Sequence, residues 1–375
     1  MISFPFCPNP LCDLHLSEPP PGWFAPFGFY PTRTFGLVPR FRCRSCGRTF
    51  STQTFSVDYY AKRTVDYPGL IDRHASSESL RALSRNLKLS CGTVQNRLDR
   101  LARQGIALHA RLRRFANPKE AVCIDGLISF TVSRFFLSEI TLSITSGSRF
   151  VLDASHATRR RSGTITPSQR TRATELYPRV SFERGAVSRT FRDILDGIRE
   201  DRAAREGFPL VLITDEKKEY QHALSNNPLF RDQDEAHRVA HLRVHSELPR
   251  TFSNPLFASN YLDREIRKDQ ANHRRETVCF SRNVANGMSR LMCYLVHHNY
   301  RKRYRIGGRA DQDRVHGEAA GIPRRRIEQA LTEMFSRRAF LSRTFLTESQ
   351  RRIWVKGYPT PLKSVVEHLP SFAAA

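Results

Sequence analysis

Two aspartates follow apolar runs directly and are the first candidates for chemistry. Asp125 follows AVCI and Asp215 follows PLVLIT, 90 positions further along the chain (125 to 215). A carboxylate at the end of a buried strand is costly unless it is paired, hydrogen-bonded or bound to a metal. Two such strand ends predict a two-metal site for phosphoryl transfer, with Mg²⁺ (or Mn²⁺) ions about 4 Å apart on the attacking and leaving oxygens.

Each aspartate also has a plainer interpretation. Asp125 with Gly126 is a strong signal for a hairpin turn. Thr214 or Asp215 is suited to cap a following helix. The occurrence of both aspartates at strand ends, with a β-rich segment and a helix between them, favours the metal site.

A third ligand is expected in ASNYLDREIRK, residues 258–268. At 3.6 residues per turn, Asn260, Asp263 and Arg267 share one stripe of a helix. The amide oxygen of an asparagine is an acceptable ligand for a hard cation. Asn260 is also a good N-cap, and if it has that role the ligand is Glu265, which lies on the apolar face of the helix. Asn260, Glu265 and Asp263 therefore all remain candidates.

Four of the eight cysteines form two close pairs, Cys7 with Cys12 and Cys43 with Cys46. Two such knuckles can clasp one tetrahedral Zn²⁺, so a structural zinc is predicted. The first pair is loosely spaced, and His15 is therefore either a substitute ligand or an ordinary surface histidine. The remaining cysteines are predicted to be small core residues: Cys91, Cys123, Cys279 and Cys293.

A helix-turn-helix candidate covers residues 79–105, with a break near 88–90. Ser79 and Ser90 are suitable N-caps, and the leucine spacing predicts a shared core. The second helix of such a motif reads the major groove. It would present five side chains to DNA: Thr93, Gln95, Asn96, Arg97 and Arg100. The turn lacks the usual glycine, so a helical hairpin with a solvated basic face is the alternative.

The charge balance points to a polyanionic partner. Lys and Arg total 61 against 36 Asp and Glu, a net charge of +25, and the pI is about 10.5. No apolar run approaches the roughly 20 residues of a membrane-spanning helix, and MISFPFCPNP has neither the basic nor the apolar region of a signal peptide. We expect a cytoplasmic chain that associates with DNA in the nucleoid and not with a membrane.

The order of elements predicts an α/β chain with appended N-terminal modules. Residues 1–55 hold the cysteine pairs and read as a zinc ribbon, and residues 56–117 are basic and helical. Short β-rich runs begin at 118, followed by helices near 187–204, 259–270 and 281–300. Residues 306–375 are a basic C-terminal region.

In these motifs and their order, the chain resembles bacterial insertion-sequence transposases of the DDE type that carry an N-terminal zinc ribbon and helix-turn-helix. The resemblance covers nearly all of residues 5–305. The stretches that carry it, besides the helix-turn-helix, are CPNPLC, RFRCRSCGRTFS, CIDG, RRSGTITPSQR, ITDEKKEY, NPLFASNYLDREIR and RRETVCFSRN.

The resemblance implies a ribonuclease-H-like catalytic core over residues 118–305, with Asp125 and Asp215 as metal ligands and the third ligand on the later helix. In this group a Lys or Arg often follows the third ligand by seven residues, which selects Asn260 with Arg267. Arg267, Lys217 and Lys218 would bind phosphates, and the Arg159–Arg161 run would either do the same or form a solvated loop. His241 and His245 are expected to be structural or to contact phosphate, and not to be catalytic.

The activity implied is metal-dependent cleavage at element ends followed by strand transfer into target DNA, by a homodimer or larger assembly. Two other functions compete with this one. The first is a non-catalytic DNA-binding regulator derived from a transposase, and the second is a metal-dependent nuclease that does not transfer strands.

Overall fold

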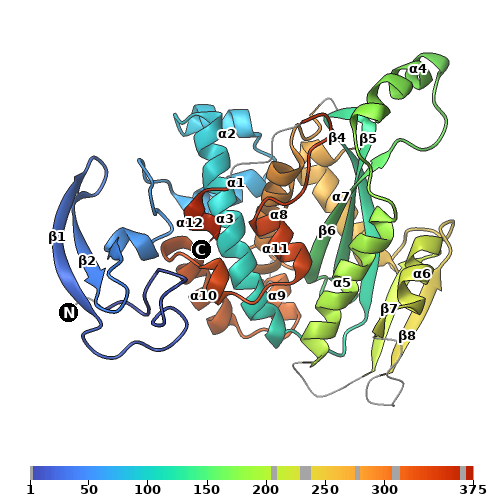
Figure 1. The fold of residues 1–375 in the computed structure, drawn as a ribbon. Helices are drawn as coiled ribbons and strands as arrows, with labels where there is room; N and C mark the ends of the chain where they lie inside the picture. Colours follow the sequence, from blue (N-terminus) through green and yellow to red (C-terminus); the bar gives the residue numbers. More distant parts are fainter. Residues whose placement is uncertain are drawn as a thin grey trace.

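A computed structural model describes residues 3–203, 209–228, 238–274, 279–305, 313–363 and 369–374. It contains a mixed five-stranded sheet in the order β6-β5-β4-β7-β8 (Figure 1). The first three strands are antiparallel neighbours, and the last two are added parallel to β4 on its other side. The bounds are β4 (Val122–Thr131), β5 (Ser133–Thr145), β6 (Val151–Arg160), β7 (Leu210–Asp215) and β8 (Val239–Val244). The predicted α/β class is confirmed.

The Asp125–Gly126 pair lies inside strand β4 and makes no turn. Asp125 is paired with Leu142 and Gly126 with Thr141 on β5. The hairpin turn comes at Val132, where the backbone has a φ of 65°. The hairpin interpretation of CIDG is therefore wrong, because the cross-strand pairing continues past the glycine.

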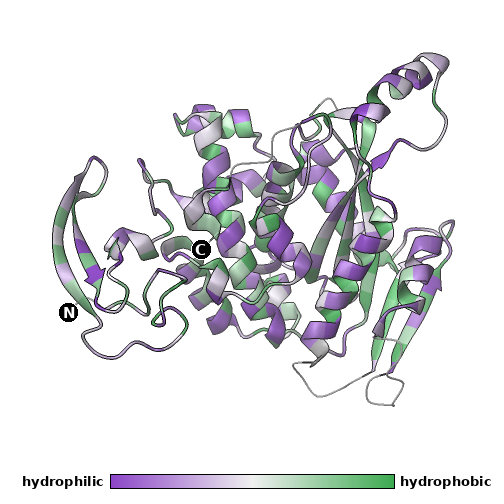
Figure 2. Ribbon diagram, viewed as in Figure 1, coloured by the Kyte–Doolittle hydropathy of each residue, from purple (hydrophilic) through white to green (hydrophobic). Residues whose placement is uncertain are grey.

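Successive side chains of β4 point to opposite faces of the sheet and therefore belong to two different cores. Val122 and Ile124 pack with α5 (Ala186–Ala203) and α6 (Lys218–Ser225). Cys123 and Leu127 belong to the larger core on the opposite face. Helices α7 (Phe257–Asp269) and α8 (Val284–Tyr300) contribute to this larger core. Figure 2 shows alternating hydrophobic and hydrophilic bands on α5, as expected for a helix with one buried face.

The predicted helix-turn-helix segment forms two capped helices, preceded by α1 (Tyr67–Ala75). The hydroxyl of Ser79 accepts a hydrogen bond at the start of α2 (Leu80–Asn86), and that of Ser90 does so at the start of α3 (Cys91–Leu112). Both predicted caps are confirmed. Lys88, in the break between the helices, has a φ of 52°.

One buried cluster crosses the predicted boundary between 117 and 118. It contains Leu98 and Ile106 of α3 together with Ile140 of β5 and Leu291 of α8. The helix-turn-helix segment therefore shares a core with the sheet. The other predicted boundary, between 305 and 306, adjoins residues outside the described part of the chain, as do residues 275–278 of the RRETVCFSRN motif.

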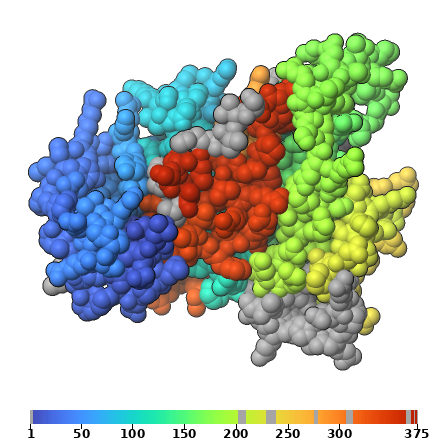
Figure 3. Space-filling view, in the orientation of Figure 1, coloured from blue at the N-terminus to red at the C-terminus, as the bar shows by residue number. Residues whose placement is uncertain are grey.

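The C-terminal segment packs between the N-terminal module and α5, as the space-filling view shows (Figure 3). It forms α9 (His316–Ala319), α10 (Arg324–Ser336), α11 (Glu348–Trp354) and α12 (Ser371–Ala374). Among the described residues, no helix is both long and apolar enough to cross a bilayer.

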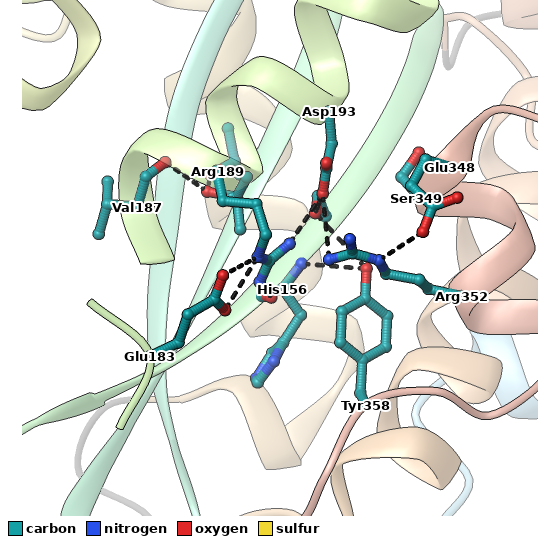
Figure 4. Close-up of polar contacts among 12 residues, drawn as sticks. His156, Glu183, Val187, Arg189, Asp193, Glu348, Ser349, Arg352 and Tyr358 are labelled. Atoms are coloured by element: carbon teal, nitrogen blue, oxygen red, sulfur yellow. Dashed lines mark hydrogen bonds and ion pairs between the residues drawn. The ribbon is translucent and has the colours of Figure 1, made fainter. Parts of the chain in front are cut away.

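Buried charges attach α11 to the sheet. Asp193 of α5 accepts from Arg189 at 2.8 Å and lies 3.7 Å from Arg352 of α11, beside Tyr358 (Figure 4). On β6, the neighbouring Asp153 accepts from two hydroxyls of α11 and its cap, Ser349 at 2.7 Å and Thr347 at 2.9 Å. A buried carboxylate needs several such partners, so these contacts hold the C-terminal segment in place.

Candidate functional site

The two aspartates lie where neighbouring parallel strands separate. Strands β4 and β7 pair only at Val122 with Leu212 and at Cys123 with Ile213. Beyond these pairs the strands part, with Asp125 on one and Asp215 at the end of the other. In the sheet, β4 lies between β5, to which the chain continues directly, and β7, which is reached only after β6 and α5. This arrangement is a topological switch point, the usual position of ligand sites in open α/β sheets.

Lys217 places its ammonium group between the two aspartates. Its Nζ atom is 3.7 Å from Oδ1 of Asp125 and 3.5 Å from Oδ2 of Asp215. A third carboxylate, that of Glu139, also lies 3.7 Å away, and the hydroxyl of Tyr220 is at 3.3 Å. One cation therefore stands at the centre of three carboxylates that come from three different strands.

Glu139 was missed in the sequence analysis, although it stands out in the apolar run FFLSEITLSI. Its side chain is completely buried, and its Oε1 atom has no hydrogen-bond partner. The other oxygen pairs with Arg159, which lies at the end of β6. The sequence did offer one sign of a site here, an acid within an apolar strand. A buried carboxylate needs a cation or hydrogen-bond donors nearby.

Gly126 lets Glu139 and Lys217 approach each other across β4. A Cβ atom at this position would lie 2.9 Å from Oε1 of Glu139, 3.2 Å from Nζ of Lys217 and 3.3 Å from the Tyr220 hydroxyl. The first contact is closer than real Cβ atoms tolerate. The glycine that suggested a turn instead leaves room here for the ends of these side chains, which would have to shift to admit a Cβ atom.

The pKa shifts follow from burial and from these charges. Burial raises the pKa of Asp125, an effect that Lys217 opposes and Asp215 reinforces. Burial alone would lower the pKa of Lys217, but Tyr220 and the three carboxylates raise it well above its ordinary value. Lys217 is therefore a permanent cation in this structure.

Asp125, Asp215 and Glu139 offer the oxygen donors that Mg²⁺ prefers. The carboxylates surround an ammonium at 3.5–3.7 Å, whereas Mg²⁺–oxygen bonds are about 2.0–2.1 Å. The donor type fits the metal, but the carboxylates would have to close in by about 1.5 Å to coordinate it. In the described part of the chain, only the four N-terminal cysteines form a compact ligand cluster.

Helix α7, which carries the three candidates for the third ligand, packs against β4 and β5. The thiol of Cys123, two residues before Asp125, donates to the carbonyl of Pro255 just before the helix. Asn260 is not the N-cap, because α7 begins at Phe257. Its backbone N–H donates to the Leu256 carbonyl, within the first turns of the helix. The capping alternative for Asn260 is therefore wrong, and its role as a ligand stays a prediction.

The other two candidates on α7 have cationic partners. Glu265 is paired with Lys302 and with Lys268, the latter at 3.0 Å. Burial would raise the pKa of Glu265, but these two lysines lower it. Asp263 lies 3.5 Å from Arg267. A metal would have to displace these cations from either acid.

The side chains predicted to read DNA do not form an exposed row on α3. Gln95, Arg97 and Arg100 are buried. Gln95 contacts Asp99 and Arg290, while the two arginines donate to the carbonyls of Arg63 and Val57. The predicted exposure of these three residues is wrong, because this end of α3 packs against α1 and α8.

The remaining predicted DNA contacts divide into locally bonded and exposed groups. Thr93 bonds the Ser90 hydroxyl, and Asn96 accepts from Arg100. Lys218 is exposed at the first position of α6. His241 contacts the Thr214 hydroxyl at 2.8 Å, as expected for a structural histidine, and His245 lies 3.7 Å from Glu216.

The four N-terminal cysteines have the geometry of a tetrahedral metal site. They lie at the edge of a three-stranded sheet of β1 (Phe24–Thr32), β2 (Gly36–Cys43) and β3 (Thr49–Ser51). The sulfurs of Cys7 and Cys46 are 3.6 Å apart, and those of Cys12 and Cys43 are 3.9 Å apart. A tetrahedron with Zn–S bonds of about 2.3 Å has edges of about 3.8 Å. The cluster can therefore hold a structural metal such as zinc.

Local donors favour a thiolate at one of these cysteines. Burial works against ionisation of Cys46, but hydrogen bonds from Asn9 and Arg48 lower its pKa to about 7. His15 is buried, and its ring nitrogens contact the Cys7 carbonyl and the Ser342 hydroxyl, each at 2.7 Å. Both nitrogens are therefore engaged, and the four cysteines form the cluster without His15, so it is not a substitute ligand. It is not a surface histidine either, because it is buried and links the cysteine module to the C-terminal segment.

Comparison with protein families and with curated proteins found no relative of this chain. The chain matches no protein-family model, and its sequence matches none of the curated proteins with which it was compared.

Proposed function

We propose that the chain is a DNA transposase of the DDE type, with a ribonuclease-H-like core that cleaves and joins phosphodiesters. The observation that carries the proposal is the convergence of Asp125 and Asp215 on one cation, Nζ of Lys217, where two parallel strands part. Two acids that share a cation at this position are suited to hold divalent metal ions.

The strand order supports the same proposal. A ribonuclease-H-like sheet is expected to have three antiparallel strands followed in the chain by two strands parallel to the first of them. Strands β4 to β8 have this arrangement, in the sheet order β6-β5-β4-β7-β8. The first acid lies on the first of these strands and the second acid ends the fourth. The net charge of +25 supports a polyphosphate substrate.

In the proposed reaction, the oxygen of a water molecule bonds to phosphorus at the element's end, and the bond to the 3′ oxygen breaks. The freed 3′-hydroxyl then attacks a phosphorus of target DNA. The bond from that phosphorus to its own 3′ oxygen breaks, and this oxygen leaves as a hydroxyl with the proton that the attacking hydroxyl has lost. Bound Mg²⁺ ions would stabilise the charge on the attacking and leaving oxygens. Asp125 and Asp215 would hold these ions, and Lys218 and Arg267 would contact phosphates nearby.

The test uses the full chain and a labelled duplex that carries the inverted repeats flanking its gene. With Mg²⁺ or Mn²⁺ we expect nicked and then joined products, and Asp125→Asn and Asp215→Asn should reduce both to background. Asp196→Asn, a change at a half-exposed acid of α5, is the matched control. Normal nicking by both site variants would show that the assignment of the site is wrong.

The same assay separates the two competing functions. Cut ends without joined products would select a nuclease that does not transfer strands. Binding of the duplex without cleavage, even in Mn²⁺, would select a DNA-binding regulator. Either outcome would overturn the proposed transposase activity.

A further inference from the structure

A groove that none of the predicted motifs explains runs between the second half of α3 and α10. Its volume is about 560 Å³, and the segment 337–345 closes one side. Figure 1 places α3 and α10 side by side, between the N-terminal module and the five-stranded sheet. None of the catalytic candidates lines it, so the groove is separate from the carboxylate site.

The groove carries a strong excess of positive charge. Five arginines line it, against a single acid, Glu333. Glu333 is already paired with Arg111 at 2.6 Å. Arg114 and Arg337 are exposed, and among the described residues neither forms an ion pair with a carboxylate. These two guanidinium groups are therefore available to an anion from outside the chain.

Two exposed aromatic rings, Phe115 and Phe345, also line the groove. The exposed fractions are 41% for Phe115 and 63% for Phe345. The guanidinium of Arg326 lies 4.1 Å from the centre of the Phe115 ring, and that of Arg114 lies 5.5 Å from the centre of the Phe345 ring. Each ring thus has a guanidinium near it and keeps a large part of its surface in water, and this exposed part can stack on a planar group.

We infer that this groove binds a single-stranded segment of nucleic acid. Arg114 and Arg337 would contact successive phosphates, since a guanidinium matches a phosphate with two parallel hydrogen bonds. Phe115 and Phe345 would stack on bases, which are reachable only when they are unpaired. A basic groove with isolated aromatic rings is typical of proteins that bind single strands. In a duplex the bases are paired and stacked on each other, so these rings could not stack on them.

This binding site changes the role expected of α3. The N-terminal half of the helix, where base contacts were predicted, is packed against other helices. Its C-terminal half instead exposes Arg111 and leads directly to Arg114 and Phe115. The inference depends on the proposed function only in taking nucleic acid as the ligand, and binding without metal tests it separately from cleavage.

The experiment measures fluorescence anisotropy of a labelled thymidine 20-mer with the full, zinc-loaded chain, in a buffer to which no Mg²⁺ or Mn²⁺ is added. Arg114→Glu/Arg337→Glu should weaken binding roughly tenfold or more and reduce the slope of log K against log[salt] by about 1.4, at about 0.7 for each lost phosphate contact. Phe115→Ala/Phe345→Ala should weaken binding roughly fivefold or more without changing that slope.

Arg184→Glu/Arg192→Glu is the matched control, because both arginines are exposed and lie near or on α5, away from the groove. It lowers the net charge by the same amount as the groove variant. Far-ultraviolet circular dichroism and the urea midpoint must be unchanged in each variant used, and single substitutions replace any pair that alters them.

Three results would overturn the inference. The first is an equal loss of binding in the control pair, which would mean that only net charge matters. The second is tighter binding of a duplex of the same length than of the single strand. The third is displacement of the 20-mer by polyglutamate as effectively as by unlabelled oligonucleotide, which would indicate a general polyanion surface.

Discussion

Replacement of Lys217 by methionine should make the stability of this protein depend on divalent metal. The ammonium group lies 3.5–3.7 Å from three carboxylate oxygens. At an effective dielectric constant of about 20, each contact corresponds to about 4.5 kcal/mol of gross Coulomb attraction. Most of that is offset by desolvation, and breaking a buried pair costs about 3–5 kcal/mol.

The lower end of that range applies here, because Asp125, Asp215 and Lys217 each keep about a quarter of their side-chain surface in water. We therefore expect Lys217→Met to lower the free energy of unfolding by about 3 kcal/mol in the absence of divalent metal. Three carboxylates without their central cation should also bind metal more tightly. Saturating Mn²⁺ at about 100 times its dissociation constant would restore about 2.7 kcal/mol.

The assay is urea unfolding with and without excess MnCl₂, together with a direct titration of bound Mn²⁺ by electron paramagnetic resonance. Lys218→Met, at the exposed neighbouring lysine, is the control and should change neither quantity. The reasoning would be refuted if Lys217→Met had normal stability, or if it bound Mn²⁺ no more tightly than the unaltered chain. If the unaltered chain and both variants bind no Mn²⁺ at all, the proposed function itself fails.

Two further predictions concern stability. Burial lowers the pKa of His109 to about 4, so this histidine contributes stability above pH 6.5 that is lost as the pH falls from 6.5 towards 4. The free energy of unfolding should fall by about 3 kcal/mol at pH 4 because of this group. Urea midpoints measured across this pH range should fall less in His109→Gln than in the unaltered chain. An equal fall in both would contradict the role assigned to His109. Cys43→Ser should abolish binding of one zinc per chain and expose Trp23, which is stacked on Phe50 in the core of the cysteine module. Metal analysis and Trp23 fluorescence in a Trp354→Phe background check this, and unchanged zinc content in Cys43→Ser would contradict it. Cys91→Ser is the control, because Cys91 is exposed; the prediction of core positions is wrong for Cys91 and Cys279 and is confirmed for Cys123 and Cys293, which are buried.

Much of the local structure was accessible from sequence because it depends on residues close together in the chain. The N-caps Ser79 and Ser90, the strand ending in Asp215 and the helix α5 all follow from short-range patterns of apolar and capping residues. The spacing of the four cysteines sufficed for the metal cluster, because each pair forms one tight knuckle. In these cases neighbouring residues alone determine the backbone conformation.

Features that require distant partners were not accessible in this way. Whether Arg97 and Arg100 face DNA or the interior depends on how α3 packs against its neighbours, and α3 is covered by α8, about two hundred positions away. Glu139 gave no motif, because its partners Lys217 and Arg159 meet it only after three strands have been aligned.

By itself, the sequence determined much of the local secondary structure, the cysteine cluster, the basic character of the chain and the presence of acids on two apolar strands. Only the tertiary structure decided which groups share one site. Lys217, Glu139 and Gly126 meet at the split between β4 and β7, while Glu265 lies with Lys268 of α7 and with Lys302, just after α8. The physical reason is that a buried carboxylate takes whichever cation the fold brings close, and closeness in space between strands is set by their order in the sheet and not by their spacing in the chain.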